Sequence, residues 1–216
     1  MIERVLAVPR PAIERHLRQG FLDAGSADLM EALGESSVFL NRPAAEADPT
    51  HKQVIPYIVI THRDQFLLYR RTKKQGESRL HDKFSLGFGG HINDIDGQSG
   101  AKTNLIMAAM VRELNEEVFI PSIRRLSVVG FINDDASPVG QVHLGVAFLV
   151  EAGSGRFAVN EPEMIEAMWS DAAGIEEVFP KLESWSQLLW TEYLKARPQA
   201  AGQEAPGLGG RASSVA

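Results

Sequence analysis

The strongest constraint on the fold is one long helical pattern set between two groups of short β-rich runs. Residues 102–118 carry apolar side chains at helical spacing over several turns. The runs before and after it are rich in β-branched and aromatic residues, and each has the length of a single strand. We predict strands at 54–60, 65–70, 84–88, 126–132 and 142–150, and a further helix over 182–194. This order of strands and helices indicates the α/β class.

The two ends of the chain differ from this middle part. Residues 1–50 contain two short helical patterns, one opened by Pro11 and one that ends at Gly34, so we expect an N-terminal helical extension. Residues 197–216 are rich in Gly, Ala, Pro and Ser and are expected to be disordered. The predicted organisation is therefore an extension over 1–50, one domain over 51–196 and a tail over 197–216.

Composition excludes several functional classes. The chain has no cysteine, which rules out disulfides, thiolate metal sites and cysteine nucleophiles. Its net charge of -6 argues against a general nucleic-acid binder. The N-terminal stretch mixes charges among its apolar residues, unlike a signal peptide, and no apolar run reaches the roughly 18 residues of a membrane span. We expect a cytoplasmic enzyme with a small-molecule substrate and no nucleic-acid or membrane partner.

Three glutamates on the long helix are the main chemical signal. Glu113, Glu116 and Glu117 fall at i, i+3 and i+4, so their carboxylates share one face. Like charges at this spacing destabilise a helix by about 0.2–0.5 kcal/mol per pair. They also lie near the C-terminal end, where the helix dipole disfavours anions. A solvated acidic face is one interpretation, and a site for a hard cation such as Mg²⁺ or Mn²⁺ is the other.

The residues around these glutamates favour the second interpretation. The segment Arg112-Glu113-Leu114-Asn115-Glu116-Glu117 resembles the REUxEE core of the Nudix hydrolase box, in which U is an aliphatic residue. Gly89-Gly90 resembles the strand end that opens the box. The segments LHDKFSLGFGGHIN and GFINDDASPVGQVHLGV are also similar to bacterial MutT-like phosphoesterases. The resemblance covers about residues 54–170 and implies an α/β/α sandwich with a mixed sheet.

The resemblance also implies roles for single residues. Glu113, Glu116 and Glu117 would hold Mg²⁺ or Mn²⁺, with the carbonyl of Gly89 as a further ligand, and Arg112 would hold a glutamate in position. The metal would activate water and neutralise charge on a diphosphate substrate. The implied activity is hydrolysis of a diphosphate linkage in a nucleotide-like or other small molecule.

The sequence departs from the usual box in three places. The loop between Gly90 and Arg112 is longer by about eight residues. Asn104 stands where the box has an upstream glutamate, and Phe119 stands where it has a late glycine. These departures motivate an alternative function, a nucleotide-binding sensor with weak or no activity.

His91 motivates a second alternative. In the Nudix-fold isopentenyl-diphosphate isomerases, a histidine at a similar place after Cys-Gly binds metal. Here His91 is a candidate metal or substrate contact, although a histidine that bonds within its own loop is the plainer interpretation. Gly89 replaces the cysteine that those enzymes need. An isomerase-like enzyme acting on a non-nucleotide diphosphate is therefore the second alternative.

Several other polar residues are weaker candidates. Glu163 and Glu166 precede an aromatic residue in a late segment and could supply a general base, although surface charge is the plainer interpretation. Substrate phosphates could meet Gly90 or the basic cluster that follows the second strand. The members of this cluster are Arg70, Arg71, Lys73 and Lys74.

The remaining residues of note have mainly structural interpretations. Asp134 and Asp135 could be ligands or a base, but turn formation is favoured for both. His143 and Tyr57 lie in strand patterns and are expected to have core or hydrogen-bonded roles. The two tryptophans of the late helix, Trp185 and Trp190, are expected to pack, and a homodimer interface there is a further expectation.

Overall fold

The centre of the protein is a mixed sheet of ten strands. The computed structural model describes residues 2–25, 27–71, 83–96 and 102–197. Across the sheet the order is β12-β5-β4-β10-β9-β2, while β1 and β7 pair with β4, β3 pairs with β1, and β6 pairs with β5. The strands are β1 (Arg4–Pro9), β2 (Gly20–Asp23), β3 (Val38–Asn41), β4 (His51–His62), β5 (Gln65–Arg71), β6 (Phe84–Ser85), β7 (Gly87–Gly89), β9 (Ile123–Asn133), β10 (His143–Ala152) and β12 (Ile165–Ser170), with β8 (Val118–Phe119) and β11 (Ala158–Val159) forming a separate pair.

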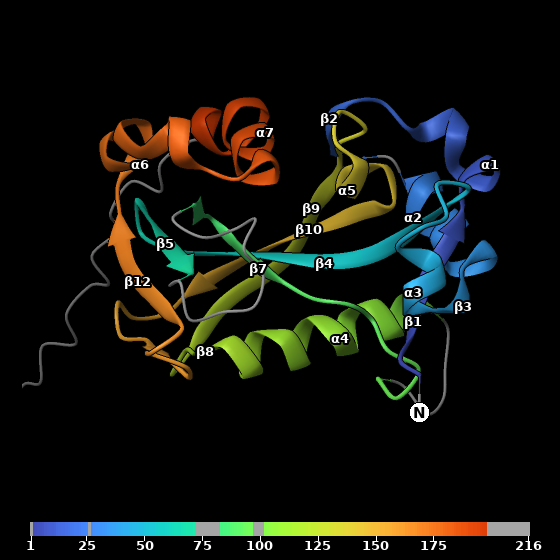
Figure 1. Ribbon diagram of the computed structural model, residues 1–216. Coiled ribbons are helices and arrows are strands. Elements are labelled where there is room, and N and C mark those ends of the chain that lie inside the picture. The colour runs from blue at the N-terminus through green and yellow to red at the C-terminus, as the bar shows by residue number, and fades with distance from the viewer. Residues whose placement is uncertain (1, 26, 72–82, 97–101, 198–216) are drawn as a thin grey trace, which may run out of the picture.

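Helices cover both faces of this sheet (Figure 1). The long helix α4 lies on one face, α6 and α7 lie on the other, and α1, α2 and α3 gather at one end. The helices are α1 (Arg10–Ile13), α2 (Ala27–Ser36), α3 (Arg42–Ala45), α4 (Lys102–Glu117), α5 (Pro138–Gln141), α6 (Ala172–Val178) and α7 (Ser184–Glu192). β4 pairs in parallel with β10 and antiparallel with β5, so the sheet is mixed. The predicted α/β/α sandwich with a C-terminal helix is confirmed.

Each face of the sheet has its own apolar core. Phe88 and Ile58 face α4 and pack with Met110 and Leu114 of that helix. The opposite face packs against α6 and α7, where Trp190 is fully buried. Within the described ranges, no helix combines the length and the apolar character that crossing a membrane requires.

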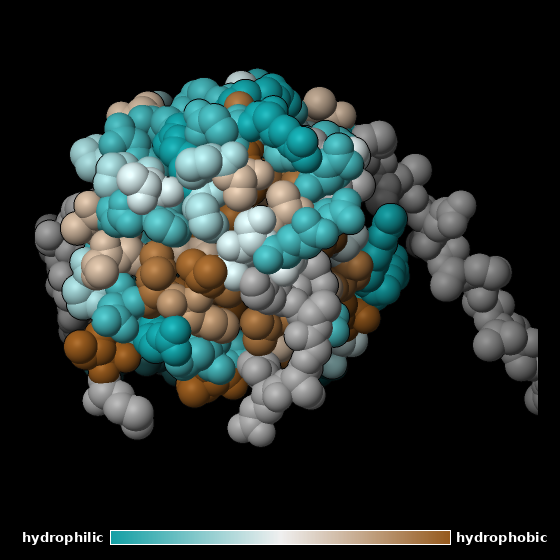
Figure 2. Space-filling model, turned by 90° about the vertical axis from the view of Figure 1, so that its right-hand side faces the viewer, coloured by the Kyte–Doolittle hydropathy of each residue, from teal (hydrophilic) through white to brown (hydrophobic). Residues whose placement is uncertain are grey.

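The first 50 residues contribute strands to the sheet as well as helices. β1 pairs with the start of β4, and β2 pairs with β9. The two helical patterns of the sequence are present as α1 and α2. Three short strands, β1, β2 and β3, accompany them, because each of these segments pairs with the edge of another strand. Figure 2 looks at this end of the molecule, where polar side chains cover the upper half and apolar side chains gather in the lower half. The division at residue 50 stays a prediction.

The helix α4 is rotated from the orientation that its pattern first suggests. Met107, Val111, Leu114 and Val118 fall at helical spacing, and the sequence predicts that these four form the core stripe. The structure buries Met110 and leaves Met107 and Val111 exposed, so this prediction is wrong for those two residues. The rotation turns Glu113 inward beside Met110 and Leu114.

The end of α4 is set by a contact from a distant segment. Asn160 donates from its side chain to the carbonyl oxygens of Asn115 and Glu116, and from its backbone to that of Glu117. These are carbonyls that a helix end leaves without an internal partner. The helix therefore ends at Glu117, ahead of the proline that follows it at position 121.

Pro56 lies inside β4, although a strand start or an edge position is the usual place for proline. On the side of β4 that faces away from β10, β1 covers residues 51–53 and β7 covers residues 57–59. Pro56 falls between these two partners, where a missing N–H group interrupts neither ladder.

The predicted strand 84–88 is divided into β6 and β7. The backbone N–H of Leu86 donates to the hydroxyl of Ser186 on α7 instead of to a neighbouring strand.

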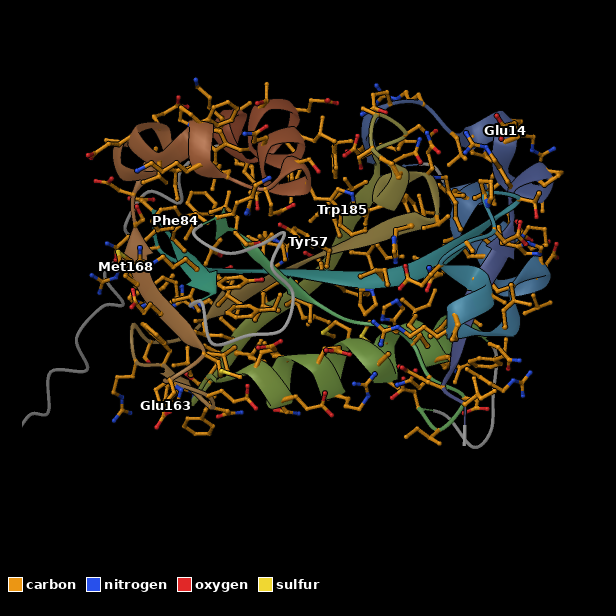
Figure 3. All side chains as sticks on the ribbon, in the orientation of Figure 1. Glu14, Tyr57, Phe84, Glu163, Met168 and Trp185 are labelled. Atoms are coloured by element: carbon orange, nitrogen blue, oxygen red, sulfur yellow. The ribbon has the colours of Figure 1, made fainter. Side chains whose placement is uncertain are left out.

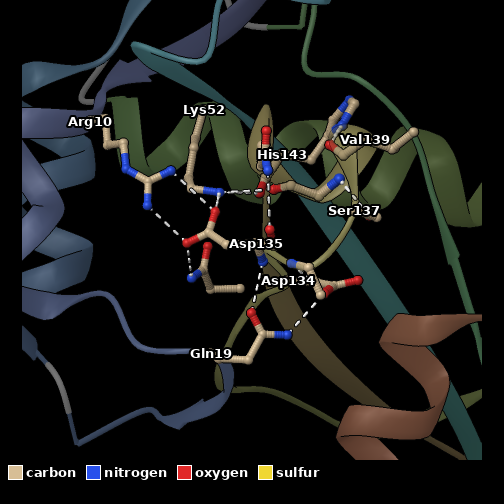
Figure 4. Close-up of polar contacts among 12 residues, drawn as sticks. Arg10, Gln19, Lys52, Asp134, Asp135, Ser137, Val139 and His143 are labelled. Atoms are coloured by element: carbon tan, nitrogen blue, oxygen red, sulfur yellow. Dashed lines mark hydrogen bonds and ion pairs between the residues drawn. The ribbon is translucent and has the colours of Figure 1, made fainter.

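A buried lysine joins the N-terminal segment to the sheet (Figure 4). The Nζ of Lys52, fully buried, donates to Asp135 at 2.9 Å, to the carbonyl of Gly140 at 2.8 Å and to that of His143 at 3.2 Å. Arg10 donates to both carboxylate oxygens of Asp135, at 3.1 and 2.8 Å. Asp134 forms the predicted turn, accepting from the backbone N–H of Ala136, whereas Asp135 is the anion between two cations.

Candidate active site on α4 and the Gly-Gly strand end

Glu113 of α4 packs directly against Gly90, which follows the end of β7. The carboxylate of Glu113 packs so tightly against the Cα of Gly90 that a Cβ there would overlap it. Glu113 is 8% exposed, and burial raises the pKa of its carboxyl group while the adjacent Arg112 guanidinium counteracts that rise. A side chain at position 90 would displace the end of Glu113, so glycine at this position keeps the carboxylate at the end of β7.

Arg112 connects this carboxylate to two further segments. It donates to Glu113 at 2.8 Å, to Glu116 at 2.9 Å and to the carbonyl oxygen of His91 at 2.9 Å. Its strongest partner is Asp96, which accepts two bonds at 2.5 and 2.9 Å and has a buried side chain. Asp96 raises the pKa of Arg112 far above its usual range, so the guanidinium stays charged and fixed. The lengthened loop thus supplies an anchor for the arginine.

The other two glutamates are more accessible. The side chain of Glu116 is 56% exposed, and Glu117 is half-buried at the last turn. Asn104 is exposed near the start of α4, and Phe119 is exposed just after its end, in β8. Arg112 brings Glu113 and Glu116 together, whereas the three α4 glutamates do not place three ligand atoms within 4.8 Å of one another.

An aromatic pocket lies on the opposite face of the sheet, beside α7. Its volume is about 170 Å³. Figure 3 shows Tyr57 and Trp185 close together beneath α7, with ring centroids 5.6 Å apart. Gly89 lines this pocket, while the next residue, Gly90, contacts Glu113. The pocket and the glutamate site therefore meet at the end of β7. The other lining residues are Ile55, Tyr69, Lys83, Phe84, Ser85, Gly87 and Glu183.

The wall of this pocket is held by a polar cluster. Tyr57 donates its hydroxyl to Glu183 at 2.5 Å and lies 2.7 Å from the hydroxyl of Ser186. Glu183 also accepts from the backbone N–H groups of Trp185 and Ser186 and so caps the start of α7. Burial, together with the Glu183 carboxylate, raises the pKa of Tyr57 well above its usual range. The tyrosine stays protonated and orients the first turn of α7, which carries Trp185. Packing of both predicted tryptophans, Trp185 and Trp190, is confirmed.

Arg70 and the predicted late carboxylates lie at a different edge of the sheet. Arg70 on β5 donates twice to Glu166 on β12, at 3.0 and 2.8 Å. Glu166 lies in a strand, because β12 pairs with β5 along its whole length. Glu163 precedes that strand and lies on the same side of the sheet as α4 (Figure 3). The side chain of Arg71 and all of Lys73 and Lys74 fall outside the described residues.

The ring of His91 is directed away from the α4 glutamates. Its Nε2 lies 3.8 Å from a carboxylate oxygen of Glu46, just after α3, and its ring centroid lies 5.7 Å from that of His143. Only its backbone carbonyl faces Arg112. His143 is buried and hydrogen-bonded, as its strand pattern predicts, with Nδ1 donating to the carbonyl of Val139 at 2.7 Å.

Several residues of these sites escape sequence reasoning. Asp96 belongs to a glycine-bearing loop, where an aspartate usually marks a turn. Glu183 and Lys83 are separated from the glutamates by long stretches of chain, and the sequence has no periodic signal that joins them. Glu46 lies in the segment that precedes the main domain. The one usable signal in the sequence is the unusual length of the loop after Gly90, which indicates an insertion with residues of its own at this site.

Comparison with known proteins identifies the class. The chain is 36% identical over 199 residues to protein YmaB from Bacillus subtilis (strain 168), covering 88% of this chain and 96% of YmaB. The crystal structure of Tm1382, a protein assigned to the Nudix hydrolases, superposes with a TM-score of 0.76 at 31% identity, covering 89% of this chain and 99% of that one. No protein-family model matches the chain.

Fold, box residues and relatives agree, and the protein belongs to the Nudix hydrolase superfamily. In this chain, strands from residues 1–50 are built into the sheet of that fold.

Proposed function

We propose that the protein hydrolyses the diphosphate linkage of a small molecule with the help of Mg²⁺ or Mn²⁺. The observation that carries this proposal is the inward-turned Glu113, packed against Gly90 and flanked by Glu116 and Glu117. Burying the Glu113 carboxylate costs free energy even beside Arg112, and two further carboxylates on the same helix add repulsion that a bound cation would relieve.

The residues fit a hard divalent cation. All three side chains offer carboxylate oxygens, which Mg²⁺ and Mn²⁺ prefer. The missing Cβ of Gly90 leaves room for the Glu113 carboxylate at the strand end, and Glu116 is exposed enough to rotate toward it. The carbonyl of Gly89 is the further proposed ligand. When bound, the metal would acidify a water molecule and neutralise charge on the diphosphate.

The protein's own groups orient this site. Arg112 holds Glu113, and the buried Asp96 holds Arg112, so the Glu113 carboxylate has a fixed direction before substrate arrives, while the exposed Glu116 keeps room to turn. Of the two late carboxylates, Glu163 is the better candidate for general base, because it precedes β12 on the side of the sheet that faces α4, whereas Glu166 is paired with Arg70 at 2.8 Å.

The pocket supports a substrate with a planar or apolar group beyond its diphosphate. The pocket is small, about 170 Å³, which suits a ring system as the part of the substrate that enters it. Tyr57 and Trp185 offer aromatic surfaces for stacking, and Lys83 places a cation at the same pocket. We propose that the ring enters this pocket while the phosphates pass Gly89 and Gly90 toward the glutamates.

A substrate panel tests the proposal. Nucleotide and non-nucleotide diphosphates are incubated with Mg²⁺ or Mn²⁺ and either wild type or Glu117→Gln, in water enriched in ¹⁸O. We expect metal-dependent turnover of at least one compound by wild type, with one solvent oxygen in the products. Glu117→Gln should lower that turnover by at least about 100-fold, because an amide is a poor ligand for a metal that needs a carboxylate.

The same panel contains the outcomes that contradict hydrolysis. Tight binding without turnover under both metals would indicate a nucleotide sensor. Turnover without ¹⁸O incorporation would indicate an isomerase-like reaction. Equal rates for wild type and Glu117→Gln would mean that the α4 glutamates do not take part in the reaction.

The pocket makes a separate prediction. Trp185→Ala should raise KM about 10-fold and leave kcat nearly unchanged, because it removes ring contacts that bind substrate and transition state equally. The matched control is Leu188→Ala, on the same helix but outside the pocket. Steady-state kinetics on the best compound of the panel measure both constants. A fall in kcat with constant KM would place Trp185 in the chemical step instead.

A further inference from the structure

A second group of possible ligands lies where the N-terminal segment meets the sheet. In the described part of the chain, Glu46, His91 and His143 place one ligand atom each within 4.8 Å of one another. They come from three separate segments: the end of α3, the loop after β7 and the start of β10. None of the three belongs to the glutamate site on α4.

The ring nitrogen Nε2 of His91 is the second feature of this group. This nitrogen is buried, and among the described residues no hydrogen-bond partner reaches it. The nearest oxygen, on Glu46, is 3.8 Å away, beyond hydrogen-bond distance. A buried polar atom without a partner costs free energy that a bound ligand would recover.

His143 has the orientation that metal-binding histidines usually have. Its Nδ1 donates to the carbonyl oxygen of Val139 at 2.7 Å, which leaves Nε2 as the nitrogen with a free lone pair (Figure 4). A ligating histidine almost always donates its other N–H to a carbonyl or carboxylate in this way.

Glu46 completes the group and opens it to solvent. The Glu46 side chain is 38% exposed. Its carboxylate lies 3.6 Å from the guanidinium of Arg42, an ion pair that is longer than a hydrogen bond. Ligand atoms about 2.0–2.1 Å from zinc in a tetrahedral site are roughly 3.3 Å apart, and the Glu46 oxygen lies 3.8 Å from Nε2 of His91, so this pair must close by about 0.5 Å to complete such a site. An exposed glutamate does this easily and leaves a path for the ion.

We infer that Glu46, His91 and His143 form a site for a divalent transition-metal ion of the Zn²⁺ type, distinct from the magnesium or manganese site on α4. Two imidazoles and one carboxylate suit Zn²⁺ and its neighbours, whereas Mg²⁺ prefers oxygen ligands alone. The site ties α3 to the loop after β7. It also fixes His91, whose carbonyl oxygen Arg112 holds at 2.9 Å.

Metal titration of the full chain tests this site without reference to activity. The protein is stripped with a chelator and titrated with Zn²⁺ by calorimetry, and with Co²⁺ by visible absorption. Wild type should bind one Zn²⁺ tightly, and Co²⁺ should give the absorption of a site with nitrogen ligands. His143→Asn keeps a side-chain N–H for Val139 but lacks the second nitrogen, and it should weaken Zn²⁺ binding at least about 100-fold. His91→Asn should do the same.

Two further variants keep the result decisive. Glu46→Gln changes an exposed residue, so it should fold normally and weaken Zn²⁺ binding at least about 10-fold. Glu116→Gln removes a ligand of the α4 site and should leave this Zn²⁺ affinity unchanged. Unaltered Zn²⁺ binding in His91→Asn and Glu46→Gln would overturn the inference, as would loss of binding in Glu116→Gln alone. Thermal unfolding of each metal-free variant confirms that it is folded.

Discussion

Replacing Glu113 with glutamine should lower kcat/KM for the metal-dependent reaction by about 1,000-fold, which equals about 4 kcal/mol of transition-state stabilisation. Glutamine has the same shape and fits the same space against Gly90, so the fold should persist. It lacks the negative charge, however, and presents an N–H group where a metal needs an oxygen. Glu113 has the largest expected effect of the three because it is the buried one, packed against Gly90 at the strand end.

The measurement compares kcat/KM of purified variants at fixed Mg²⁺ and at saturating Mn²⁺. Glu177→Gln is the matched control, since Glu177 is an exposed glutamate on α6, across the sheet from α4. It should match wild type. Thermal unfolding confirms that Glu113→Gln is folded. A loss smaller than about 10-fold at both metals would mean that Glu113 is structural, and that the inward turn of α4 serves packing alone.

Asp135→Asn should lower the free energy of unfolding by about 3 kcal/mol. The Nζ of Lys52 is fully buried, and Asp135 is the anion beside it at 2.9 Å. Removing the anion leaves the lysine charge in the interior with only carbonyl oxygens as partners. Arg10 loses both of its bonds to the same carboxylate, which loosens α1 from the sheet. Urea unfolding measures the change.

Asp135 also makes a prediction about pH. Its bonds to Arg10 and Lys52 outweigh its partial burial and hold the pKa of its carboxyl group well below the usual range. A depressed carboxyl pKa contributes stability above the unfolded value of about 3.9, and that stability is lost as pH falls toward the folded value. Wild type should therefore lose stability between about pH 5 and pH 2, and Asp135→Asn should lose less over that window.

Two control variants test the stability change expected for Asp135→Asn. Asp64→Asn changes an exposed turn aspartate and should shift stability by less than about 0.5 kcal/mol. The double variant Lys52→Met with Asp135→Asn removes the buried charge together with its partner, and it should recover part of the loss. If Asp135→Asn were as stable as Asp64→Asn at pH 7, the network would contribute nothing measurable.

The fold was largely predictable because its strands and its long helix have strong local patterns. The runs at 54–60 and 142–150 became the central pair β4 and β10, and the helix over 102–118 became α4. Residues 1–50 were harder, because strands as short as Gly20–Asp23 are defined by the partner that they meet far along the chain. The rotation of α4 was also beyond the pattern, since methionines at 107 and 110 both fit an apolar stripe.

The candidate site was predictable where its residues are close in sequence. Arg112 and the three glutamates lie within two turns of one helix, so their spacing carries the signal. Asp96 and the aromatic pocket depend on folding that brings distant segments together. The same is true of His91, whose position after Gly90 was visible but whose ring direction follows from the pairing of the next residues with β1.

The position of β4 affects how the chain acquires its structure during synthesis. β4 can pair early with β1, β5 and β7, all of which are made before α4 is complete. Its other edge waits for β10, which ends at Ala152. A nascent chain that has only reached α4 therefore carries an open, apolar strand edge in its future core, the kind of edge that chaperones shield and that other chains can join. Slow translation between α4 and β10 would prolong that exposure.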